Sequence, residues 1–241
     1  MSDAALSSNP VPMRDRLIFA MDVPDAAQAR ELAETLGDSV QFYKLGMELV
    51  TSGDYFALVD WLVERDKKIF VDLKFFDVPA TVARAVKGLR GRGVTFATVH
   101  GNQGMMEAAA EAAGEVGILA VTALTSLDRG DLDDLGFACD VEELVVSRAR
   151  RALEAGCAGV ISSGLEAPML RDRVDGKLLV VTPGIRPVEN RPADDQKRVV
   201  DVATAFRSGV DHIVVGRPIR NADDPKAAAE SIQSTIAAVF A

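Results

Sequence analysis

The sequence predicts a single-domain α/β fold, the (β/α)8 or TIM barrel, and three observations lead to that prediction. The chain has 241 residues, and barrels of about 250 residues commonly form one domain. Short apolar runs alternate along it with longer, alanine-rich helical stretches. Eight such runs share residues 14–241, which leaves about 28 residues per unit, close to one βα repeat.

The eight predicted strands are almost continuously apolar, as expected for parallel strands covered on both faces. They span residues 16–22, 40–46, 68–74, 95–100, 117–125, 158–163, 177–184 and 211–216. Helices are predicted between and after them at residues 26–37, 55–66, 79–93, 105–113, 141–156, 197–209 and 225–240. Gly37, Gly156 and Gly209 stand in helix-stop positions.

An open, doubly wound sheet is the alternative for such alternating elements. A dinucleotide-binding sheet would carry G-x-G-x-x-G after its first strand, and residues 16–37 contain no such motif. No linker rich in Pro, Gly or Ser and no break in composition divides the chain. We therefore expect one domain, the barrel at residues 14–241, preceded by a flexible N-terminal tail at residues 1–13.

Composition excludes several function classes. The net charge is −9, from 27 basic and 36 acidic residues, which argues against a general nucleic-acid binder but leaves an anionic small substrate open. The two cysteines, Cys139 and Cys157, favour a reducing compartment. The acidic N-terminus resembles neither a signal nor a transit peptide, and no apolar run approaches the length of about 20 residues that spans a bilayer. We expect a cytoplasmic protein without nucleic-acid or membrane partners.

Polar residues end most of the predicted strands. Because a barrel enzyme binds substrate at the carboxyl ends of its strands, these side chains would gather at one mouth. They are Asp22, Lys44, Asp72 with Lys74, and His100 on the first four strands, Thr125 and Ser126 on the fifth, and Gly216 with Arg217 on the eighth. Charged groups are seldom buried unpaired, so the pattern predicts a site there.

The densest segment is VDLKFFDVPATV, residues 71–82. Side chains alternate along a strand, so Asp72 and Lys74 should project to the same side, with Asp77 just beyond at the start of a helix. A lysine held between carboxylates stays protonated, which suits proton delivery rather than Schiff-base chemistry. The alternative is a structural ion pair followed by a helix-start aspartate.

At these residues the chain resembles the orotidine 5′-monophosphate decarboxylase family, whose enzymes catalyse the last step of pyrimidine biosynthesis. The resemblance covers nearly the whole chain after the tail. Its motifs are FAMD (19–22), YKLG (43–46), DLKFFDVPATV (72–82), TPGIRP (182–187), DDQKR (194–198) and VVGRPI (214–219). It implies a carboxy-lyase that uses neither metal nor organic cofactor.

The resemblance also implies roles for single residues. The family's alternating Lys-Asp-Lys-Asp array would be Lys44, Asp72, Lys74 and Asp77, with Lys74 protonating C6 of the pyrimidine as carbon dioxide leaves. Asp22 and Lys44 would hold ribose hydroxyls.

Further residues would contact the rest of the substrate. Asp77 and Thr81 would reach the ribose bound by a neighbouring subunit, so a homodimer would share its active sites. Thr125, alone or with Ser126, would contact the pyrimidine edge.

The phosphate end would involve a loop. The segment 183–196 holds several prolines and has no helical period, which is typical of a functional loop, although an ordinary solvated turn is the alternative. Gln196 would contact both the base and the phosphate. Arg217 and the backbone amide of Gly216 would bind the phosphate, and Arg186 would lie at the substrate loop.

Two rival functions are possible for such a barrel. Hexulose-phosphate synthase and keto-gulonate-phosphate decarboxylase relatives also carry Asp-x-Lys-x-x-Asp, but they resemble magnesium-dependent enzymes with an acidic residue at the position of Lys44. A non-catalytic phosphate-sensing barrel would be expected to lack parts of the array, and none is missing. His100 has two equal interpretations, as an orienting group or as an ordinary strand-end histidine.

Overall fold

A closed parallel barrel confirms the predicted fold class. The computed structural model describes residues 6–186 and 200–241. The strands follow one another in sequence order, and β1 pairs with both β2 and β8. They are β1 (Leu17–Ala20), β2 (Phe42–Gly46), β3 (Lys68–Phe75), β4 (Val94–His100), β5 (Gly117–Val121), β6 (Gly159–Ile161), β7 (Leu179–Thr182) and β8 (His212–Val215).

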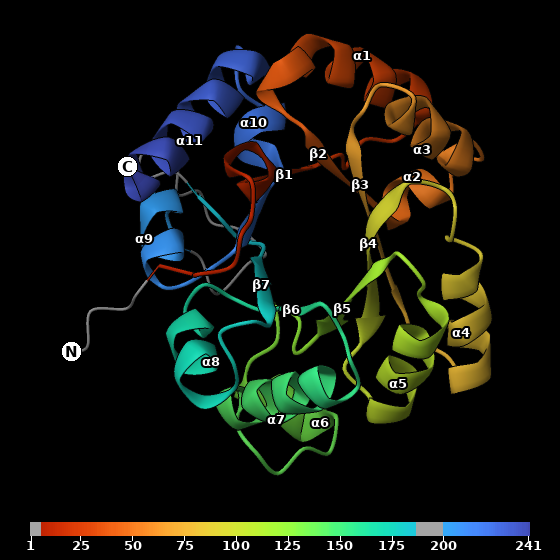
Figure 1. Cartoon of the computed structure of the whole chain (residues 1–241), viewed down its shortest axis with the longest axis vertical. Coiled ribbons are helices and arrows are strands. Elements are labelled where there is room, and N and C mark those ends of the chain that lie inside the picture. Colours follow the sequence, from red (N-terminus) through yellow and green to blue (C-terminus); the bar gives the residue numbers. More distant parts are fainter. Residues whose placement is uncertain (1–5, 187–199) are drawn as a thin grey trace.

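Helices surround this ring of strands (Figure 1). They are α1 (Ala26–Leu36), α2 (Met47–Val50), α3 (Tyr55–Val63), α4 (Pro79–Lys87), α5 (Gln103–Ala112), α6 (Arg129–Asp134), α7 (Val141–Glu154), α8 (Ala167–Arg173), α9 (Val202–Arg207), α10 (Arg217–Arg220) and α11 (Pro225–Phe240), with 3-10 turns at Met13–Arg16 and Gly37–Ser39. The helices α2, α6, α8 and α10 were not predicted, because four to seven residues are too few to show a helical period. Within the described ranges, no helix is long and apolar enough to cross a membrane.

Helix ends follow the local rules. Gly156 and Gly209, predicted to stop helices, have φ values of 79° and 90°, a left-handed conformation that glycine adopts without steric cost. The helix predicted at residues 197–209 begins at Val202, where the Asp201 side chain caps it by accepting from the Thr204 amide; residues 197–199 lie outside the described part.

The barrel interior changes from apolar to charged along the strands. Phe42, Phe70 and Phe96 fill its middle, with ring centroids 5.5 Å apart for Phe42 and Phe96. Two residues further along β2 and β3, on the same inward side, stand Lys44 and Asp72. The aromatic layer therefore forms an apolar floor under the charged mouth.

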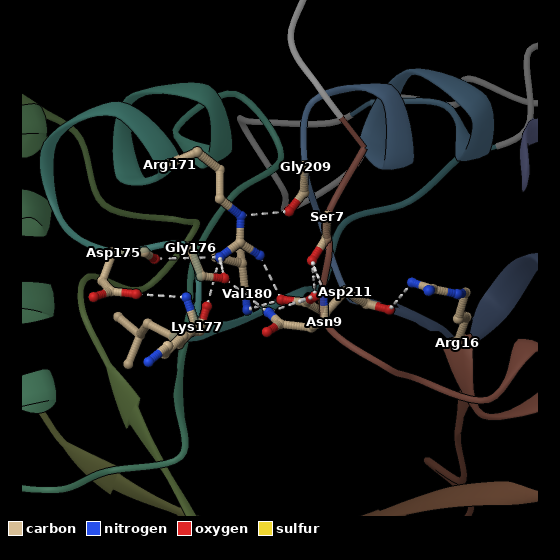
Figure 2. A network of polar contacts seen from close by, with 11 residues as sticks. Ser7, Asn9, Arg16, Arg171, Asp175, Gly176, Lys177, Val180, Gly209 and Asp211 are labelled. Carbon is tan, nitrogen blue, oxygen red and sulfur yellow. Dashed lines mark hydrogen bonds and ion pairs between the residues drawn. The ribbon is translucent and has the colours of Figure 1, made fainter.

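A polar network lies where β7 and β8 begin, at the end of these strands opposite the charged mouth (Figure 2). Asp211, fully buried before β8, pairs with Arg171 of α8 and accepts from the Val180 amide at 2.7 Å. The Ser7 hydroxyl and the side-chain amide of Asn9 also donate to the Asp211 carboxylate. Part of the predicted tail thus contacts the barrel, while its flexibility and the proposed domain limits stay predictions.

Removal of the buried carboxylate should destabilise the fold. Asp211→Ala leaves the Arg171 guanidinium without its acidic partner, and we expect a loss of about 3 kcal/mol in the free energy of unfolding, measured by urea denaturation. Asp175→Ala, at a half-buried aspartate in the same network whose carboxylate accepts from the Lys177 amide, should cost less than about 1 kcal/mol. Equal losses in the two variants would contradict the assigned importance of Asp211.

Candidate active site

A cavity of about 470 Å³ opens at the carboxyl ends of the strands, a size usual for small-molecule sites. Its lining includes predicted site residues from both halves of the barrel: Asp22, Lys44, Asp72, Lys74, Thr125, Arg186, Gly216 and Arg217. A larger hollow of about 730 Å³ lies on the outer helices. We place the site at the mouth, because the strand-end charges converge there.

Four of these side chains form a chain of alternating charge. The Lys44 ammonium lies 2.9 Å from Asp22 Oδ1 and 3.6 Å from Asp72 Oδ2. The Lys74 ammonium lies 2.8 Å from the same Asp72 oxygen. The predicted placement of Asp72 and Lys74 on one side is therefore confirmed, and one carboxylate serves two cations.

Charge pairing outweighs burial in this array. Burial opposes the charged form of Lys44, but Asp72 and Asp22 together hold the pKa of its ammonium above the usual value. Burial likewise opposes the ionised form of Asp72, yet Lys44, Lys74 and a hydrogen bond from Thr98 hold the pKa of that carboxyl below its usual range. Both groups are therefore charged at neutral pH.

A second group of cations lines the side of the cavity formed by β7, β8 and α10. Arg217 is exposed at the start of α10, while Arg186 is buried after β7 and donates to the Ile185 carbonyl at 3.0 Å. A side chain at Gly216 would come within 3.2 Å of the Ala20 Cβ, so the chain passes close to β1 here. Gln196, the remaining predicted contact, lies outside the described residues.

Two charged residues of this cavity were missed by the sequence analysis. Arg220 lines the cavity and donates to the Asp22 carbonyl. It stands three residues after Arg217, a spacing that places both on one side of a helix, but α10 was not predicted. Glu48, in the equally short α2, also lines the cavity.

Asp77 and Thr81 occupy a different position. Among the described residues that line the cavity, neither appears. Asp77 is exposed just before α4, where its carboxylate accepts from the Val78 amide at 2.6 Å, and Thr81 accepts from Arg84. Their neighbours Phe76 and Val78 are each 63% exposed. The single chain thus holds these two residues outside its own mouth.

Two open alternatives become clearer. Thr125 lines the cavity, whereas Ser126 is not part of the described lining; a contact of either residue with a pyrimidine stays a prediction. His100 packs edge-on against Phe76, with centroids 5.0 Å apart, and burial together with Arg148 and Lys74 lowers the pKa of its imidazole. A neutral strand-end histidine fits this environment.

The barrel and the charged mouth define the class: a (β/α)8-barrel protein whose site presents alternating lysine and aspartate side chains beside a cluster of arginines. Residues 15–232 match the model of the Orotidine 5'-phosphate decarboxylase / HUMPS family, and the chain belongs to that family.

Curated relatives named orotidine 5'-phosphate decarboxylase agree with this. The chain is 67% identical over 236 residues to that of Methylococcus capsulatus, covering 98% of both chains, and 53% identical over 240 residues to that of Stenotrophomonas maltophilia, covering 98% of this chain and 99% of the relative. A crystal structure of orotidine 5'-phosphate decarboxylase from Lactobacillus acidophilus superimposes with a TM-score of 0.81 at 36% identity, covering 92% of this chain and 99% of that one. The predicted family and its enzyme class, a carboxy-lyase, are confirmed.

Proposed function

We propose that this protein converts orotidine 5′-monophosphate to uridine 5′-monophosphate, the last step of de novo pyrimidine nucleotide synthesis. The observation that carries the proposal is the Lys74 ammonium held 2.8 Å from buried Asp72, in one cavity with Arg217 and Arg186. The arginines suit a phosphate dianion, and the names of the close relatives support the substrate.

Lys74 has the chemistry that this decarboxylation needs. When the bond between C6 and the carboxylate carbon breaks, its electron pair stays on C6 in an orbital that the ring cannot delocalise. A positive charge about 4 Å away stabilises such an anion by about 4 kcal/mol at an effective dielectric near 20. The same ammonium then transfers a proton to C6 as carbon dioxide leaves.

The charged array would also bind the ribose. Asp22 and Lys44, paired at 2.9 Å beside the reacting lysine, offer an acceptor and a donor for ribose hydroxyls. Thr125 would contact the pyrimidine edge, and Gln196 would bridge base and phosphate.

We further propose a cytoplasmic homodimer with shared sites. Asp77 and Thr81 lie outside the cavity of their own chain, next to the exposed apolar side chains of Phe76 and Val78. An apolar patch around polar residues suits a subunit contact that carries them into a partner's site. Both cysteines are free thiols, which fits a reducing compartment.

The magnesium-dependent reactions of related barrels are disfavoured by Lys44. Its ammonium lies between Asp22 and Asp72, the two carboxylates that a divalent cation at this position would need, and would repel the metal. The family model alone does not separate these activities, since its description includes both.

A spectroscopic assay tests the proposed function. Purified protein mixed with orotidine 5′-monophosphate and excess chelator should convert the ultraviolet spectrum of the substrate into that of uridine 5′-monophosphate. Turnover that needs added magnesium, or none with any metal, would refute the proposal.

Arg217→Ala should separate phosphate binding from chemistry. Loss of charge-assisted hydrogen bonds to the phosphate should lower kcat/KM by about 100-fold or more, or about 3 kcal/mol, yet hardly change the slow turnover of the nucleoside orotidine. Arg207→Ala, at an exposed arginine at the end of α9, is the matched control and should resemble the unmodified protein. Equal losses on both substrates would count against the phosphate role of Arg217.

A further inference from the structure

One buried hydroxyl connects two residues of the charged array, Asp72 and Lys74. Thr98, on β4, is fully buried. Its Oγ1 accepts a hydrogen bond from the Lys74 amide at 2.9 Å and donates one to Asp72 Oδ1 at 2.9 Å. These directions are forced, because a backbone N–H can only donate and an ionised carboxylate can only accept.

The backbone of β3 is irregular where this hydroxyl binds. Val71 pairs with Ala97 and Phe75 pairs with Val99. Between these two pairs the chain advances by four residues along β3 but by only two along β4. Within this bulge Lys74 has a φ of 48°, in the left-handed region that residues with a Cβ seldom adopt. Such a conformation persists only where neighbouring groups hold it. At the bulge in the β3–β4 ladder, the Lys74 amide donates its hydrogen bond to the Thr98 hydroxyl instead.

The same hydroxyl sets the orientation of the Asp72 carboxylate. Oδ1 of Asp72 faces Thr98, whereas Oδ2 faces the ammonium groups of Lys74 at 2.8 Å and Lys44 at 3.6 Å. The two oxygens therefore have separate partners, and the plane of the carboxylate is fixed between them. Rotation of Asp72 would move both lysines.

We propose that Thr98 is a positioning residue for catalysis, which holds the left-handed backbone of Lys74 and the carboxylate plane of Asp72 at once. In the described part of the chain Thr98 does not line the cavity, so it would act through these two residues and not by touching substrate. The kinetic part of this inference rests on the proposed decarboxylation, whereas the structural part does not.

Two pairs of variants isolate the hydroxyl. In the first pair, the native Thr98 has the hydroxyl and Thr98→Val lacks it, while the two side chains are equal in size. In the second pair, Thr98→Ser has the hydroxyl and Thr98→Ala lacks it, and neither side chain has the methyl group of threonine. We expect Val and Ala to lower kcat for orotidine 5′-monophosphate by about 100-fold, the effect of a displaced reacting group, with little change in KM. Ser should retain most of the activity.

Hydrogen exchange supplies a readout that needs no substrate. In 15N-labelled protein the Lys74 amide should exchange about 10-fold faster in the Val and Ala variants than in the Thr and Ser forms. Thr122→Val is the matched control. Thr122 directly follows β5, is fully buried like Thr98, and donates to the Ile161 carbonyl instead of to Asp72. This variant should leave Lys74 exchange and kcat unchanged.

Each outcome decides the inference. Folded Val and Ala variants with native kcat or native Lys74 exchange would overturn it, as would Ser and Ala variants that lose activity equally. Unfolding of both Val and Ala variants would make Thr98 a residue needed for folding and would also overturn it. If the unmodified protein does not decarboxylate the substrate, the proposed function fails, while the exchange comparison still decides whether Thr98 holds Lys74.

Discussion

Lys74→Ala should abolish decarboxylation while the protein remains folded. The substitution removes the cation that stabilises the C6 anion and the acid that protonates it, so we expect kcat to fall by at least about 10⁴-fold. The Lys74 side chain is 32% exposed at the barrel mouth, and its removal opens no cavity in the apolar core. Turnover is measured from the ultraviolet change, and folding from circular dichroism and urea denaturation.

Lys68→Ala provides the matched control. Lys68 begins the same strand, β3, and pairs with Asp15 at the other end of the barrel, so the same substitution there should leave kcat nearly unchanged. A folded Lys74→Ala protein with near-native turnover would refute the role of Lys74 as acid and stabilising cation.

Mixed dimers should recover activity if the sites are shared. Lys74→Ala and Asp77→Ala chains should each be nearly inactive alone. When they are unfolded together and refolded, random pairing makes about half of the dimers mixed, and each mixed dimer has one site with both residues intact and one with neither. About a quarter of all sites should therefore become active. Turnover before and after mixing measures the recovery, and sedimentation verifies the dimers.

A second mixture tests whether activity can return for a reason other than the sharing of sites between subunits. Asp72 and Lys74 are in contact within one chain, 2.8 Å apart, so Lys74→Ala mixed with Asp72→Ala should regain nothing. Recovery in this control would show that activity came from something other than pairing. No recovery with Asp77→Ala, despite verified mixed dimers, would leave Asp77 as a residue of its own chain's helix start.

Local sequence was sufficient to predict the barrel, the order of its strands and the mouth at which charges gather. These features depend on short-range periodicity: an apolar run forms a strand, a helix returns the chain, and the strand end carries the polar residue. Asp22, Lys44, Asp72 and Lys74 were found this way, because each stands at a strand end and every strand of a parallel barrel ends at the same mouth. Short helices such as α10, with Arg220, were missed because four residues show no period.

Only the folded chain shows how β3 meets β4. Regular alternation predicted that Asp72 and Lys74 would point together, but the strand reaches that arrangement through a bulge with Lys74 in a left-handed conformation. Thr98 looks like any threonine in an apolar strand, and its contact with both residues depends on the register between two strands. Ser7 and Asn9 likewise meet Asp211 across some 200 residues of chain. Register and such distant contacts are set by packing of the whole barrel, which no local pattern encodes.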